Sequence, residues 1–159
     1  MKVLLVIPTY NYKRKYPTFL SVSDLASGFA YLSSSLEEGG HVAYGLNLNN
    51  ITGYSSAYDM INDNITQALE SVKPDLVGLG GLCIDYKFLK DAIQIIRKTK
   101  VKIVLGGGIV NNDTEFIFNL LKPDFCILGE GEETIVKLCD ALEKGEDLES
   151  IENLGYWEE

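Results

Sequence analysis

Short apolar segments alternate along this chain with segments that have helical periodicity. The apolar segments cover residues 2–7, 42–46, 75–82, 101–105 and 124–128. They lack the polar alternation of a strand with one face in water, so we expect strands buried on both faces. Because no two of them lie close enough for a hairpin, right-handed crossovers must join them. The sequence therefore predicts an α/β fold, a Rossmann-like (flavodoxin-like) three-layer αβα sandwich with a five-stranded parallel sheet in the order 2-1-3-4-5.

The intervening segments carry apolar residues at helical spacing. The first helix is expected to begin near Ser23 or Asp24, either of which can cap it, and to end at Gly39 and Gly40. The next two are expected at residues 57–72 and 86–97, a short one after a cap at Asp113 or Thr114, and a last one from Glu132 past Leu142.

Length, charge and cysteine content exclude several classes of protein. The 159 residues suffice for one domain with a real core, and 46% of them are hydrophobic. With 23 acidic and 14 basic residues the net charge is −9, so nucleic acid is not an expected partner. No segment has the pattern of a signal peptide or a membrane span, so we expect no membrane partner and a cytoplasmic protein. Cys83, Cys126 and Cys139 are too widely spaced to indicate a disulfide framework or a metal site.

Glycines are concentrated just after the third, fourth and fifth predicted strands. Seven of the 15 glycines lie there, at positions 80, 81, 106, 107, 108, 129 and 131. Turns alone would distribute glycines over both ends of the sheet, although for any single glycine a tight turn is an equally good explanation. In an open parallel sheet this edge is where ligands bind. The pattern therefore predicts a surface made mostly of backbone that accepts a broad ligand.

Several common ligands of this fold are disfavoured by the loop after the first strand. A dinucleotide site needs a glycine-rich turn there, and a flavodoxin-like phosphate loop needs hydroxyls and glycines, whereas this chain has Pro8-Thr9-Tyr10-Asn11. A phosphoacceptor site needs carboxylates for magnesium, but the corresponding positions hold Pro8, Gly80 and Gly129. His41 stands at the entrance to the second strand, where a turn residue is favoured over a metal ligand.

The segment Asp75-Leu76-Val77-Gly78-Leu79-Gly80-Gly81-Leu82, followed by Gly106-Gly107, resembles the cobalamin-binding domain family. In that family the dimethylbenzimidazole tail of the corrinoid is buried beside the central strand. The usual Ser-x-Leu motif is here Gly80-Gly81-Leu82, so the hydroxyl normally offered to the tail is absent. The Asp-x-His-x-x-Gly motif that supplies the lower cobalt ligand is also absent, since its glycine corresponds to Gly28 but its histidine position falls near Leu25. The resemblance thus implies base-off cobalamin without a protein histidine ligand, and no metal-ligating residue in this chain.

One branch of the family lacks the histidine motif and carries a Gly-Glu-Gly-Glu turn like residues 129–132. The chain is similar there to the amino-terminal domain of cobalamin-dependent radical S-adenosylmethionine enzymes, which include methyltransferases and oxidative cyclases. Residues 1–145 are accordingly expected to be the cobalamin-binding domain and residues 146–159 a connector toward a radical S-adenosylmethionine domain. That partner domain would hold S-adenosylmethionine and a [4Fe-4S] cluster, so this chain alone is expected to be no enzyme and to have no catalytic residue.

The candidate cofactor-binding residues lie at the carboxyl ends of the first, third, fourth and fifth predicted strands. They are Thr9, Tyr10, Asn11, Leu79, Gly80, Gly81, Leu82, Cys83, Gly106, Gly107, Gly108, Ile109, Gly129, Glu130, Gly131 and Glu132. Two alternatives remain open at this point. One is a nucleotide- or flavin-binding module that uses the same glycine edge, and the other is an interaction scaffold that binds no ligand.

Overall fold

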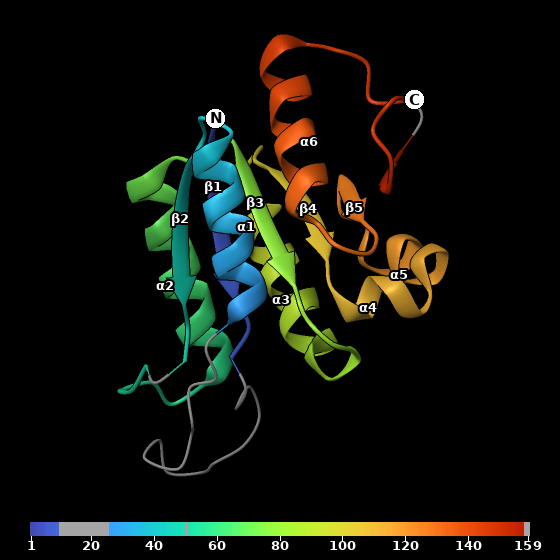
Figure 1. Cartoon of the computed structure of the whole chain (residues 1–159). Helices are drawn as coiled ribbons and strands as arrows, with labels where there is room; N and C mark the ends of the chain where they lie inside the picture. The colour runs from blue at the N-terminus through green and yellow to red at the C-terminus, as the bar shows by residue number, and fades with distance from the viewer. Residues whose placement is uncertain (10–25, 50, 158–159) are drawn as a thin grey trace.

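The computed structural model describes residues 1–9, 26–49 and 51–157, and shows a single sheet in the order β2-β1-β3-β4-β5-β6 (Figure 1). The strands are β1 (Lys2–Ile7), β2 (Val42–Asn47), β3 (Leu76–Gly80), β4 (Lys102–Gly106), β5 (Phe125–Ile127) and β6 (Leu154–Tyr156). The first five are parallel and stand in the predicted order, which confirms the predicted fold class. β3 lies between β1 and β4 and is buried along its whole length, as its uninterrupted apolar sequence predicts.

The predicted number of strands is wrong, because the chain returns to the sheet after its last helix. β6 pairs antiparallel with β5, with Gly155 opposite Cys126. Beyond it, the Trp157 ring stacks on Phe118 with a centroid separation of 4.3 Å, and its Nε1 donates to the carbonyl of Pro123 at 2.9 Å. A three-residue strand is too short to show a period in sequence. The sixth strand lies within the stretch expected to be a connector, and the domain boundary itself stays a prediction.

The helices agree with the predicted segments except at some ends. They are α1 (Ser27–Glu38), α2 (Ala57–Val72), α3 (Tyr86–Ile96), α4 (Gly108–Asn112), α5 (Thr114–Leu121) and α6 (Glu132–Lys144), with a 3₁₀ turn, η2 (Cys83–Asp85), before α3. α1 begins later than predicted, and the expected caps Ser23 and Asp24 lie outside the described residues. α4 was not expected, because three successive glycines suggest a loop. None of the helices in the described ranges combines the length and the apolar character needed to cross a membrane.

Two helices, α2 and α5, end with the same local backbone conformation. Lys73 after α2 and Lys122 after α5 both adopt left-handed backbone angles, with φ of 50° and 51°, and each precedes a proline. Proline disfavours helical geometry in the residue before it, so the chain leaves each helix and enters the next strand directly. α5 begins where predicted, because the Asp113 side chain accepts a hydrogen bond from the Phe116 amide at 3.1 Å.

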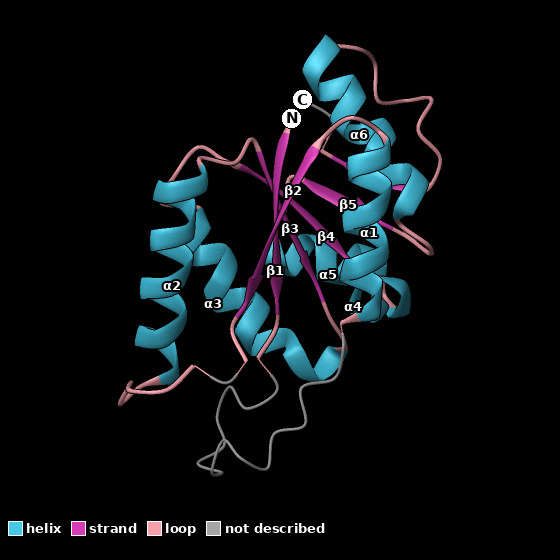
Figure 2. Cartoon of the chain, turned by 60° about the vertical axis from the view of Figure 1, so that its left-hand side comes forward, coloured by secondary structure: helices cyan, strands magenta, loops and turns pink. Residues whose placement is uncertain are grey.

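The helices cover the sheet on both faces (Figure 2). A separate apolar core lies on each face. α2, α3, α4 and α5 pack on one face over residues such as Leu4, Val77 and Ile103. α1 and α6 pack on the other face, through Leu36 of α1 and Leu138 of α6. In the described ranges, α1 and α6 cover that second face, and the site described next lies between them at the carboxyl ends of the strands.

Candidate functional site

A cavity of about 220 Å³ lies between the sheet, α1 and α6 and opens at the carboxyl edge of the strands. Its floor is the middle of the sheet, where it contacts Leu5, Gly78 and Val104. One wall is the first turns of α1, and the other includes Ile135 of α6. The rim consists mainly of the loops that follow β3, β4 and β5. The cavity therefore reaches from the glycine edge down beside the central strand.

The cavity exists because side chains are missing from one face of the sheet. Successive strand residues point to opposite faces, so Leu76, Gly78 and Gly80 all face α1 and α6. In the register of β3 and β4, Gly80 stands opposite Gly106. A Cβ atom added at Gly106 would meet only the Ile127 carbonyl oxygen, at 3.7 Å. Two facing glycines thus form a trough in which a flat group can lie against bare backbone.

The loops at the rim are held by hydrogen bonds among themselves. The Ile109 amide donates to the carbonyl of Gly81 at 3.0 Å, which joins the loop after β4 to the loop after β3. Gly107 has φ of 85°, and a Cβ there would lie 3.0 Å from both the N and the O of Gly81, so this position requires glycine. The Gly129 amide donates to Asn111 Oδ1 at 2.9 Å. These internal contacts fix the shape of the rim, and a fixed rim lowers the entropy lost on binding.

The charge of the cavity disfavours polyphosphate ligands. Its charged lining residues are Glu130 and Glu132 at the rim, and no Lys, Arg or His lines it among the residues that the structure describes. Glu132 lies in the first turn of α6, where its carboxylate is favoured by the helix dipole. An apolar, largely glycine-lined cavity of this kind suits a neutral aromatic group better than a di- or triphosphate.

Most of the predicted site residues come together at this cavity. Nine line it, namely Leu79, Gly80, Gly81, Gly106, Gly107, Gly129, Glu130, Gly131 and Glu132. Five predicted residues do not line it, namely Thr9, Leu82, Cys83, Gly108 and Ile109. Thr9 and Ile109 are buried, whereas Leu82 and Cys83 are exposed on the other side of the rim. Tyr10 and Asn11 lie outside the described residues.

Sequence reasoning missed the floor and the walls of the cavity. These residues are Leu5, Gly28, Phe29, Leu32, Gly78, Val104, Ile127 and Ile135. Two signals were available: Gly28 matches the glycine of a family motif, and Gly78 interrupts an otherwise bulky strand. A Cβ at Gly78 would approach Leu5 Cδ2 to 2.7 Å, so the bare backbone at this point also admits the neighbouring side chain.

The three cysteines differ in exposure, and this predicts their reactivity. Burial raises the pKa of the Cys126 and Cys139 thiols to about 12, so both stay protonated and unreactive at neutral pH. Cys83 is exposed in η2, with Asn112 Nδ2 3.2 Å from its Sγ. We expect a thiol reagent such as Ellman's reagent to modify one cysteine rapidly at pH 7.5 in the native chain and all three in denaturant. Rapid modification of two or three thiols in the native chain would contradict this burial.

Several known proteins are similar to this chain in sequence. The family model described as "B12 binding domain" matches residues 26–139. The chain is 30% identical to the "Uncharacterized methyltransferase PH0819" of Pyrococcus horikoshii across 99% of its own length and 33% of that protein. It is 34% identical to the "Uncharacterized protein MJ1620" of Methanocaldococcus jannaschii across 54% of its length and 16% of that protein. The chain thus spans a third or less of the curated relatives it matches.

Among solved structures, the chain is similar to the radical S-adenosylmethionine methyltransferase TsrM of Kitasatospora setae. The structure of TsrM with tryptophan substrate and a SAM analogue aligns with a TM-score of 0.79 at 21% identity, over 99% of this chain and 28% of TsrM. The structure of TsrM with cobalamin and a [4Fe-4S] cluster aligns with a TM-score of 0.78 at the same identity, over 99% and 29%. At this identity the similarity establishes a shared fold.

Proposed function

Because the chain belongs to the B12-binding domain family, we propose that the cavity between α1 and α6 receives the dimethylbenzimidazole tail of cobalamin, with the corrin ring outside on the glycine rim. Family membership confirms cobalamin as the predicted cofactor. The observation that carries the placement of the tail is the trough of Gly80 and Gly106, in which bare backbone leaves room for a flat ring.

The size of the cavity also supports placing the tail of the ligand inside it and the corrin ring outside. Pockets that enclose a whole drug-sized molecule usually measure roughly 300–1,000 Å³. A cavity of about 220 Å³ is too small for a corrin but suits one bicyclic base. The macrocycle then lies over the rim, where the backbone of the loops after β3 and β4 approaches it closely.

A base buried in this cavity is not bound to cobalt, and no histidine is positioned to replace it. The chain has one histidine, His41, which directly precedes β2 at the amino edge of the sheet, opposite the cavity. We therefore propose a base-off cofactor without a histidine ligand from this chain. The residues that hold it are the cavity residues named above, and the cobalt chemistry is supplied by the cofactor.

We further propose that this domain is the amino-terminal part of a larger radical S-adenosylmethionine enzyme. The chain aligns over nearly all its length with one third of a protein named as a methyltransferase. Its fold matches a fraction of TsrM, whose structures hold cobalamin and a [4Fe-4S] cluster. S-adenosylmethionine and the cluster are expected in the remaining part of such an enzyme, and a methyl transfer is the reaction class that this relationship favours over oxidative cyclisation.

Spectroscopy of the reconstituted chain tests the proposed function. The chain is incubated with hydroxocobalamin, desalted and reduced to the cob(II)alamin state. We expect about one corrinoid per chain, and an electron paramagnetic resonance spectrum whose cobalt lines lack the further splitting caused by a coordinated nitrogen. A chain that retains no corrinoid at micromolar concentration would contradict binding, and retention of flavin or nucleotide instead would favour the alternative module. Nitrogen splitting in the retained corrinoid would contradict the base-off state.

A further inference from the structure

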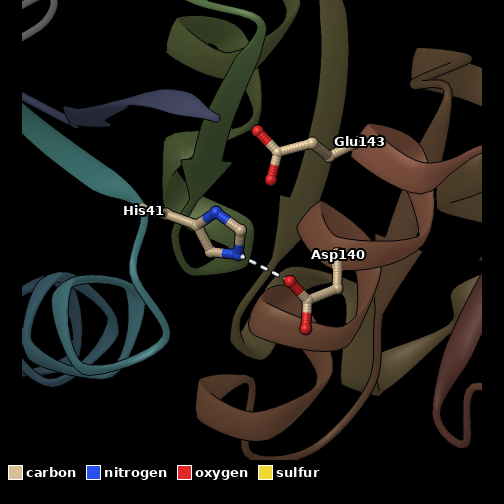
Figure 3. Close-up of side chains that lie close together, drawn as sticks. All are labelled: His41, Asp140 and Glu143. Carbon is tan, nitrogen blue, oxygen red and sulfur yellow. Dashed lines mark ion pairs between the residues drawn. The ribbon is translucent and has the colours of Figure 1, made fainter.

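A cluster of three metal-ligating side chains lies at the amino edge of the sheet, remote from the cavity. His41 precedes β2, while Asp140 and Glu143 stand in the last turns of α6 (Figure 3). One ligand atom from each residue lies within 4.8 Å of those of the other two. Asp140 and Glu143 are three residues apart, so one face of the helix presents both carboxylates to the imidazole.

The imidazole in this cluster is buried and incompletely paired. The His41 side chain is 2% exposed, and its Nδ1 lies 3.2 Å from the amino group of Met1. Its Nε2 makes no hydrogen bond with any described atom, although Asp140 Oδ1 is 3.5 Å away. A buried polar atom without a hydrogen bond costs about 1–3 kcal/mol, so it indicates a missing partner.

The distance between His41 Nε2 and Asp140 Oδ1 can be compared with that expected for a hydrogen bond and for two ligands of one metal ion. A charge-assisted hydrogen bond between such groups measures about 2.7–2.9 Å, and 3.5 Å is well beyond this. Zn²⁺ binds imidazole nitrogen and carboxylate oxygen at about 2.1 Å, so two ligand atoms in a tetrahedral site lie about 3.4 Å apart. The observed spacing is therefore compatible with two groups that share an ion.

We propose that His41 Nε2, Asp140 and Glu143 form a binding site for a divalent first-row transition metal ion, with Zn²⁺ as the representative case. One imidazole and two carboxylates form a donor set that Zn²⁺ accepts, and water completes the tetrahedron. This goes beyond the expectation that His41 is a turn residue.

The surroundings favour a cation at this position. The site lies at the carboxyl end of α6, where the helix dipole favours positive charge. Both carboxylates already pair with cations, with which a metal ion would compete: Met1 N is 3.2 Å from Glu143 Oε1, and Lys144 Nζ is 3.8 Å from Asp140 Oδ2. Each carboxylate has two oxygens, so one can keep its present partner while the other binds the ion. Glu143 is 55% exposed and can move the short distance that coordination requires.

Because His41 is the single histidine of the chain, nuclear magnetic resonance of its ring nitrogens gives an unambiguous test. The full chain, purified without a histidine tag and labelled with ¹⁵N, is titrated with ZnCl₂. We expect the Nε2 resonance to move to the range of a metal-bound nitrogen at one equivalent. The ring proton then stands on Nδ1, and the Met1 amine, which now donates to Nδ1, releases a proton and accepts from it. Asp140→Asn and Glu143→Gln should each weaken Zn²⁺ binding in calorimetry by at least about tenfold.

Glu133→Gln is the matched control, because it removes the same charge from the opposite end of α6. It should bind Zn²⁺ like the unmodified chain. The proposal is overturned if the ring nitrogens do not respond to one equivalent of Zn²⁺. It is also overturned if Asp140→Asn and Glu143→Gln bind the ion as tightly as Glu133→Gln. Both carboxylates are partly exposed, so all three variants are expected to fold, and circular dichroism verifies this.

Discussion

Replacing Gly106 with Val should abolish tight retention of cobalamin and leave the fold intact. The new side chain enters the trough between β3 and β4, where the tail is proposed to lie. Overpacking of a filled site costs about 1–3 kcal/mol, which weakens binding by roughly fivefold to more than a hundredfold. The empty chain tolerates the change, because a Cβ at Gly106 meets only one atom, at 3.7 Å, and Val suits a strand.

Gly45→Val supplies the matched control for this experiment. Gly45 lies in the edge strand β2, has nothing within 4 Å of an added Cβ, and does not line the cavity. Both variants are compared by corrinoid retained after desalting and by thermal unfolding. A folded Gly106→Val chain that retains cobalamin as well as Gly45→Val would refute the placement of the tail. Gly107 is unsuitable for such a test, because its left-handed backbone and its contact with Gly81 make any side chain disrupt the rim itself.

The sequence sufficed to predict the parallel sheet and the glycine edge of the site. Five apolar segments separated by segments with helical periodicity are compatible with few sheet topologies. β3 is predicted to be a central strand because no polar residue interrupts it. Gly80 and Gly106 were predicted to share one edge because carboxyl ends of parallel strands lie together. The structure brings these two residues into direct register.

The walls of the cavity and the sixth strand could not be predicted in the same way. The packing of α1 across the sheet decides which of its faces lines the cavity. Phe29 and Leu32 line it, but in the sequence they cannot be distinguished from ordinary core residues. β6 has three residues, and its pairing with β5 depends on the path of the chain after α6. Leu82 and Cys83 were predicted from their position after β3, but η2 turns them away from the cavity.

The Asp124 carboxylate accepts hydrogen bonds from three donors where α3, β4 and β5 meet, and we expect it to contribute to stability. Its Oδ2 accepts from the Ile103 amide at 2.8 Å and from Arg97 Nη1 at 2.7 Å, and its Oδ1 lies 3.3 Å from Lys102 Nζ. Arg97 also donates to the carbonyl of Lys122 at 2.8 Å, so the guanidinium joins the end of α3 to the turn before β5. The Asp124 side chain is 16% exposed, which limits how far water can replace these partners.

Asp124→Asn should therefore lower the free energy of unfolding by about 2 kcal/mol, because the amide keeps the shape, loses the charge and turns one NH₂ toward existing donors. The urea midpoint should fall by about 1 M at a slope of roughly 2 kcal/mol/M. Asp147→Asn is the control, because this exposed side chain accepts one local hydrogen bond, from the Glu149 amide, and its loss should change stability by less than about 0.5 kcal/mol. Equal midpoints for the two variants would contradict the role assigned to Asp124.

Since Asp124 lies at the amino edge of the sheet, the folded Asp124→Asn chain should retain cobalamin. This result would separate the residues that maintain the sheet from those that line its cavity.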